Sequence, residues 1–179
     1  MRRFFEPRKI ITMYRAATDD QGQVSCSRGG HMEMGTEENE AIVRGVCERV
    51  QAAVAAGEPI AARDQLIYDI DYLVMEANSG ASYEQYFRWA SPEEIGRVVA
   101  ACRAVGLDEV AALTEQAIAV AFPDGIPSDP ESMDEATDWS EEQEDQLQQL
   151  FGKLEDHNGR ITNVLGRYAS GSTPGVSEH

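Results

Sequence analysis

The clearest α-helical segment of the chain is SPEEIGRVVAACRAVG, residues 91–106. Ser91 and Glu94 have the spacing of a capping box, and Pro92 stands at the first helical position, where a missing N–H is tolerated. Apolar side chains then recur every three or four residues until Gly106, and they are Ile95, Val98, Val99, Cys102 and Val105. The segment predicts an amphipathic helix that packs against other elements through one face.

The same periodicity extends on both sides of this segment. It predicts helices from Thr36 to Gly57 and from Ile60 to Ala77, with a break at residues 78–80 where Asn78 and Gly80 adopt left-handed backbone conformations. Downstream, Asp108 is expected to cap a helix that runs to Phe122. Ser140 and Gln143 predict another capping box, and Asn158-Gly159 separates that helix from the last one. Residues 123–137 are expected to form a loop and an acidic linker.

No alternating strand pattern follows residue 35, so the predicted fold class is all-α, a single compact bundle of about six helices. Within it, the aromatic segment 83–89 is interpreted as core packing rather than as a ligand pocket. Its four large rings are expected to lie beneath the turn at residues 78–80, and they belong to Tyr83, Tyr86, Phe87 and Trp89.

The chain has 179 residues, the size of one domain, and its charge is unevenly divided. We expect a basic, irregular or disordered segment at 1–35, an acidic helical domain at 36–169 and a flexible tail at 170–179. Residues 1–31 carry six basic and three acidic side chains, and the part from Lys9 to Arg15 has the composition of a short strand. Met32 and Met34 precede the first helix, which leaves a later translation start as an alternative.

The net charge of −17 and the pI near 4.4 argue against direct binding to nucleic acid or to anionic membranes. No Lys or Arg lies between Arg103 and Lys153, and ten acids fall within residues 124–145. They are Asp124, Asp129, Glu131, Asp134, Glu135, Asp138, Glu141, Glu142, Glu144 and Asp145. Surface helices normally mix charge signs, so this density predicts a partner-binding surface that imitates phosphates, with an acidic loop that only aids solubility as the alternative.

Residues 78–87, Asn-Ser-Gly-Ala-Ser-Tyr-Glu-Gln-Tyr-Phe, resemble the Asn-Gly-Gly-Phe-x-Gln-Tyr-Phe signature of the bacterial DNA-mimic protein family. The resemblance continues through Phe122-Pro123-Asp124-Gly125-Ile126-Pro127 and covers roughly residues 40–168. Ser79 replaces the first glycine, and Ala81-Ser82 is an apparent insertion. The resemblance implies a helical protein whose charge distribution is similar to that of double-stranded DNA and which occupies the DNA-binding face of a transcriptional regulator. No individual acid is carried over from the family.

The sequence gives little support to enzymatic, metal or cofactor chemistry. His31, His157 and His179 have no ligand or base partner at motif spacing, and Asp69 and Asp71 are two apart, on different faces of a helix. Three cysteines, Cys26, Cys47 and Cys102, match no zinc or redox motif, and the last two are expected to be buried thiols. With no signal peptide or apolar run of membrane-spanning length, a cytoplasmic location is predicted.

Three functions therefore remain as hypotheses. The first is a non-enzymatic DNA mimic that regulates transcription by binding a basic regulator or nucleoid protein. The second is an immunity-type inhibitor of a basic toxin or enzyme, for which an acidic surface is equally expected. The third is a small-molecule binder or enzyme that uses the aromatic segment as its pocket.

Overall fold

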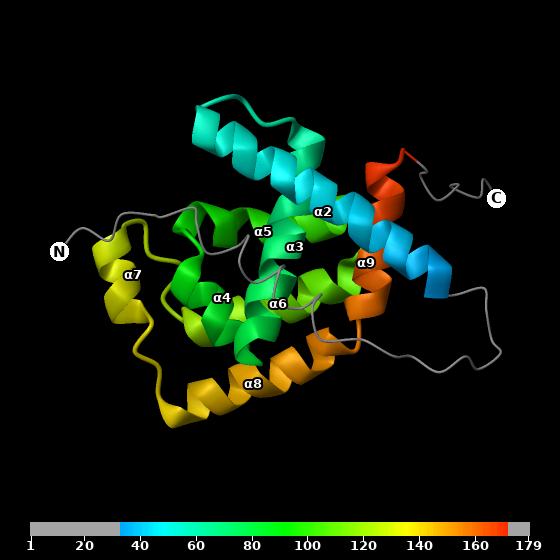
Figure 1. Cartoon of the computed structure of the whole chain (residues 1–179). Helices are drawn as coiled ribbons and strands as arrows, with labels where there is room; N and C mark the ends of the chain where they lie inside the picture. The colour runs from blue at the N-terminus through cyan, green and yellow to red at the C-terminus, as the bar shows by residue number, and fades with distance from the viewer. Residues whose placement is uncertain (1–32, 172–179) are drawn as a thin grey trace, which may run out of the picture.

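The computed structural model describes residues 33–171, which form eight α-helices joined by short turns and one longer loop (Figure 1). The helices are α2 (Glu33–Ala56), α3 (Ala62–Gly80), α4 (Tyr83–Trp89), α5 (Pro92–Ala104), α6 (Asp108–Ala121), α7 (Pro130–Ala136), α8 (Glu141–Glu155) and α9 (Asn158–Ala169). The predicted all-α class is confirmed. Two short helices, α4 and α7, add to the expected six.

Helix α3 runs through the middle of the bundle and contacts α2, α4, α5 and α9. Helix α2 crosses α3 and packs along α9 on one side of the molecule, while α8 packs against α6 and α4 on the other (Figure 1). Helix α7 lies at one end of the molecule, and a loop joins it to the beginning of α8 (Figure 1). The long loop and α7 thus join two helices, α6 and α8, that pack directly against each other.

The aromatic segment lies at the centre of the core, as predicted, except for its last ring. Tyr83, Tyr86 and Phe87 have no exposed surface, and the Phe87 ring makes an edge contact with Phe122 at 5.3 Å between centroids. The prediction is wrong for Trp89, which is 47% exposed because it is the last residue of α4. These rings fill the core and are not open to a ligand.

The helix ends agree with the sequence prediction at both capping boxes, Ser91–Glu94 and Ser140–Gln143. They differ at the end of α3, where Asn78 and Gly80 remain helical and Ala81 takes the left-handed conformation, with φ of 51°. Gly80 is instead required by close packing, because a Cβ there would lie 2.6 Å from the Cβ of Gln85.

Asp108 is also not the cap of its helix. Leu107 occupies the N-cap position, and Asp108 is the first residue of α6, where its charge favours the positive end of the helix dipole. Leu107 is 1% exposed, so its apolar side chain serves the core at a position where sequence preference favours a polar cap.

An ion pair with one buried partner links α3 to α5. Asp69 is 3% exposed and accepts from Arg97 Nε at 3.0 Å and Nη2 at 3.1 Å. Gln65 Nε2 adds a third hydrogen bond to the same carboxylate at 2.7 Å. The carboxylate is therefore satisfied, as a buried charge must be. Asp71 instead faces α2, where it accepts from the Cys47 thiol, so Asp69 and Asp71 lie on different faces of α3, as predicted.

Cys47 and Cys102 are buried thiols, as predicted. Burial is the main cause that raises the pKa of both, that of Cys102 to about 12. The Cys47 thiol donates to Asp71 Oδ2 at 3.2 Å, and this carboxylate raises the thiol pKa further. Both thiols thus stay protonated at neutral pH.

Several sequence predictions fall outside the described residues, among them the strand at Lys9–Arg15, Cys26, His31 and His179. Over residues 33–171 no helix is both long and apolar enough to cross a membrane. The same residues contain no cluster of three or more His, Cys, Asp or Glu side chains arranged to hold a metal ion.

Candidate partner-binding surface

The ten acids lie on a segment that begins after α6, passes through α7 and ends in the second turn of α8. Trp139, just before α8, fixes this segment to the core. Its side chain is 7% exposed, and its indole N–H donates to the carbonyl of Ala121 at 3.1 Å. The centroids of the Trp139 and Phe87 rings are 6.4 Å apart, and the guanidinium carbon of Arg88 lies 4.9 Å from the centroid of the Trp139 ring. The acidic segment is thus tied to α4 and α6.

Helix α7 corrects the expectation of a loop and linker over residues 123–137. Asp129 accepts from the backbone N–H of Ser132 at 2.9 Å and from its hydroxyl at 2.8 Å, which is the bonding of an N-cap. Met133 is 7% exposed and belongs to the hydrophobic core. In the sequence, Asp129-Pro130 has the pattern of a helix start. The apolar pattern that follows it is too short to predict a helix.

The beginning of α8 is held by two polar contacts in addition to its apolar face. Ser140 and Gln143 satisfy each other's backbone groups in a capping box. The same Gln143 side chain donates from Nε2 to the carbonyl of Val120 at 2.8 Å, which joins the start of α8 to the end of α6. Leu147, Leu150, Phe151 and Leu154 bury the inner face of the helix. The outer face is thereby fixed in orientation.

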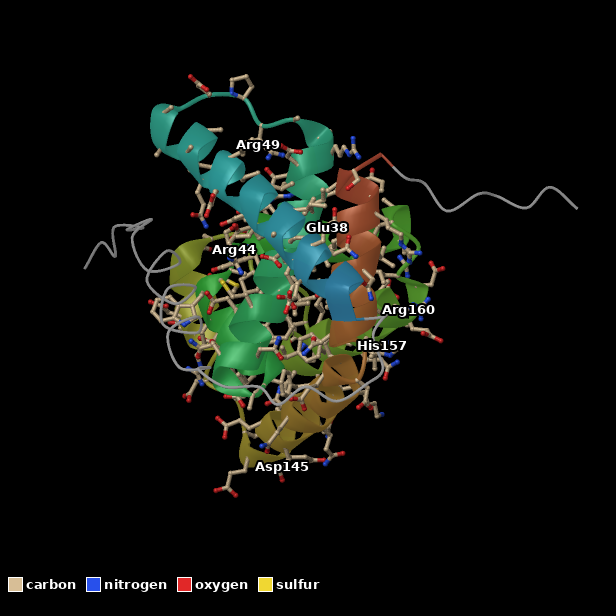
Figure 2. The ribbon with its side chains drawn as sticks, turned by 45° about the vertical axis from the view of Figure 1, so that its right-hand side comes forward. Glu38, Arg44, Arg49, Asp145, His157 and Arg160 are labelled. Carbon is tan, nitrogen blue, oxygen red and sulfur yellow. The ribbon has the colours of Figure 1, made fainter. Side chains whose placement is uncertain are left out.

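Most of the ten acids project into solvent from this fixed segment. The exposed ones are Asp124, Asp129, Asp134, Glu135, Asp138, Glu141, Glu142 and Asp145, and Glu144 is half-buried. The placement of the Glu131 side chain is not described. Figure 2 shows Asp145 projecting from α8 away from the other helices. Along α8, Glu141, Glu144 and Asp145 have the three- and four-residue spacing that brings neighbouring side chains within about 5–6 Å.

Apart from Asp129, and from Glu131, whose side chain is not described, these carboxylates form no ion pair within the described part of the chain. The ion pairs of residues 33–171 use other acids, namely Asp64, Asp69, Glu84, Glu109 and Glu115. Arg88, at the edge of the acidic segment, pairs with Glu84 at 3.6 Å and stacks on Trp139. Lys153, the next base along α8, lies two turns beyond Asp145. The charge of the other eight carboxylates is therefore not balanced by ion pairs within residues 33–171.

Residues 33–171 contain 28 acidic and nine basic side chains, a net charge of −19, and ten of the acids belong to residues 124–145. The rest of the described chain, with eighteen acids and nine bases, carries −9. About half of the net charge is thus concentrated on one edge of the molecule, formed by α7 and the beginning of α8 (Figure 1). We call the ten acids the acidic edge.

The histidine expected to lack a motif partner, His157, lies outside the acidic edge at the turn between α8 and α9. Its Nδ1 is 3.9 Å from a carboxylate oxygen of Glu109, which also pairs with Arg160. Figure 2 places His157 and Arg160 close together on this side. The Glu109 carboxylate links α6 to α9 through its ion pair with Arg160, and this role is structural.

Comparison with known proteins gives one match. The family model described as DMP19-like protein matches residues 58–171, which comprise helices α3 to α9 and the whole acidic edge. No curated protein and no solved structure matches the chain. Helix α2 lies before the matched residues, although it packs along α9 and α3 in the structure.

Proposed function

We propose, because the chain belongs to the DMP19-like family of DNA-mimic proteins, that its acidic edge binds the DNA-binding face of a basic regulator or nucleoid protein in place of DNA. The family membership confirms the resemblance seen in the sequence and supports a non-enzymatic DNA-mimic type of protein. The identity of the ten acids as the binding residues, and the class of partner, belong to the proposal.

The observation that carries the proposal is the concentration of exposed carboxylates on a segment fixed to the core. A protein that grips phosphates presents cations in a fixed array, and a mimic must present anions in an equally fixed array to compete. Trp139 and Gln143 provide that fixation through hydrogen bonds to Ala121 and Val120. A solubility loop needs no such anchoring.

Capture from lysate at low and high salt, with the bound proteins identified by mass spectrometry, tests the proposal. We expect basic DNA-binding proteins that are released by salt, because exposed charges are screened over about 8–10 Å at physiological ionic strength. Duplex DNA should displace the captured protein. A partner that stays bound at saturating DNA contradicts mimicry and favours the immunity-type inhibitor.

A charge variant locates the interface. Changing Glu141, Glu142, Glu144 and Asp145 together to Gln or Asn removes four charges from the acidic edge. At about 0.5 kcal/mol for each exposed charge pair, partner affinity should fall roughly 30-fold, mainly through slower association. The matched control changes Glu38, Glu48, Glu93 and Glu155 to Gln, all exposed and outside the edge. Equal loss in both quartets would show that net charge alone matters.

A further inference from the structure

A groove of about 330 Å³ lies along the seam between α6 and α8, next to the acidic edge. Gln143 at the beginning of α8 bonds to the carbonyl of Val120 at the end of α6. Glu109, at the beginning of α6, pairs with Arg160 of α9, which follows the end of α8. The two helices are therefore antiparallel, and the groove follows the line where they meet.

The groove combines an apolar base with exposed polar side chains. Its less exposed lining residues are Val120 and Leu150, and the exposed polar ones are Gln116, Gln146, Gln149 and Lys153. Gln146 makes a long contact of 3.5 Å with Glu142. Within residues 33–171, the amides of Gln116 and Gln149 form no hydrogen bond, and the Lys153 ammonium forms no ion pair. These groups remain available to a partner.

We propose that this groove receives one face of an α-helix of the DNA-binding partner, with the glutamine amides in the place of base edges and the acidic edge in the place of phosphates. The inference rests on the proposed function and adds to it the part of the partner that binds here. A carboxamide presents an N–H donor beside a C=O acceptor, and adenine presents its N6 donor beside its N7 acceptor in the major groove in the same way. Asn and Gln side chains that read adenine are therefore able to pair with a glutamine amide.

Each groove amide on α8 has a carboxylate of the acidic edge one turn before it. Glu142 precedes Gln146, and Asp145 precedes Gln149, by four residues, a spacing that brings helical side chains within about 5–6 Å of each other. DNA-binding proteins combine base contacts, which specify, with phosphate contacts, which position. A partner helix that carries both kinds of side chain thus meets both kinds of group side by side on α8.

The charges at the two ends of the groove favour a helix and give its direction. Glu142 and Asp145 lie at one end and Lys153 at the other, and Glu142 is about 16 Å from Lys153 along the axis of α8. The opposite charges of a small zwitterion are too close together to reach both ends, whereas a helix of about eleven residues has this length. Its macrodipole places the positive N-terminus at the carboxylates and the negative C-terminus at Lys153. The full charges of the acidic edge exceed the half charge at the N-terminus of α8 itself.

A synthetic helical peptide tests the assignment by NMR titration of the isotope-labelled full chain. The probe has about fourteen residues and a lactam bridge that holds it helical. It carries arginines in its first turn, two asparagines one turn apart on one face, and glutamates in its last turn. The control peptide has the arginines last and the glutamates first. We expect the side-chain amide signals of Gln116 and Gln149 to shift and saturate, with several-fold tighter binding of the probe than of the control. No shift of these signals at millimolar probe, or equal binding of both peptides, overturns the proposal.

Two neighbouring glutamines of α8 give a matched pair of variants. Gln148 and Gln149 are both exposed and form no hydrogen bond through their side chains within residues 33–171, but only Gln149 lines the groove. Gln149→Ala should weaken binding of the probe about three- to tenfold, as expected for the loss of one amide pairing, and Gln148→Ala less than twofold. Lys153→Gln should reduce the preference for the probe over the control peptide. Equal effects of Gln148→Ala and Gln149→Ala contradict the role of the groove. Unchanged backbone signals elsewhere show that each variant is folded.

The results separate this inference from the proposed function. If a captured basic protein is displaced by duplex DNA but the probe leaves the groove amides unshifted, the groove assignment is wrong and the function of the acidic edge stands. If duplex DNA displaces no captured protein, the proposed function fails, and the assignment of the amides as base edges fails with it, even where the probe binds.

Discussion

Replacing Trp139 by Ala tests whether the acidic edge is held by the core. The substitution removes a nearly buried ring, its contact with Phe87 and the hydrogen bond to the carbonyl of Ala121. Truncation of a buried Trp costs about 3–5 kcal/mol, of which the orphaned carbonyl accounts for about 1–3. The lost cation–π contact with Arg88 adds about 0.5–1 kcal/mol.

The sum is about 3.5–6 kcal/mol, so at roughly 2–4 °C per kcal/mol for a domain of this size, Tm should fall by about 7–24 °C. Thermal unfolding followed by far-UV circular dichroism measures it. Trp139→Phe, which keeps an aromatic ring but loses the N–H and part of the indole, should lose about 1–3 kcal/mol. Trp89→Ala is the control, because Trp89 is 47% exposed, and it should cost less than about 1.5 kcal/mol. If Trp139→Ala lowers Tm no more than Trp89→Ala does, the anchoring role is wrong.

Four other substitutions and one pH titration follow from the packing. A Cβ at Gly166 would overlap Asn39 of α2, so Gly166→Ala should destabilise by about 1–3 kcal/mol in urea unfolding, whereas Gly152→Ala, with open space, should stabilise by about 0.5–1 kcal/mol. Asp69→Ala should cost about 1–3 kcal/mol and Asp64→Ala, from the exposed pair with Arg49, under 1 kcal/mol. Because the folded state raises the pKa of Cys102 to about 12, it binds more protons than the unfolded state above pH 9, and the unfolding free energy should fall between pH 9 and 12. A flat profile in urea titrations over that range would contradict this last expectation.

The sequence was sufficient where a local signal and the tertiary structure agree. Both capping boxes, the helix end at Gly106 with φ of 78°, and the burial of the two thiols follow from spacing and residue type. Sequence reasoning failed where packing decides. Leu107 replaces a polar N-cap because the core takes its side chain, and Gly80 is required for contact with Gln85 rather than for a left-handed turn.

For the acidic edge, the sequence shows how many acidic residues there are but not that their segment is fixed to the core. Residues 123–137 have a loop-like composition. They are held by the buried Met133 and by Trp139, which bonds to Ala121 of α6, 18 residues earlier, and contacts Phe87 of α4. Such non-local contacts produce no periodic apolar pattern in the sequence of so short a helix. The distinction between a flexible acidic linker and a fixed acidic edge therefore required the structure.

Fixing ten carboxylates on one edge places like charges a few ångströms apart, and this repulsion destabilises the segment by some tenths of a kcal/mol for each neighbouring pair. The helix dipole of α8 offsets part of it at Glu141 and Glu142, and Asp129 gains from capping α7. The remainder must be offset by the buried anchors, of which Trp139 is the largest. A chain selected only for solubility has no need to hold charges in this way, since the same acids spread over the surface, or paired with bases, give the same solvation without the repulsion. An aromatic anchor beneath an exposed acidic edge is the arrangement that the proposed cation-binding surface requires.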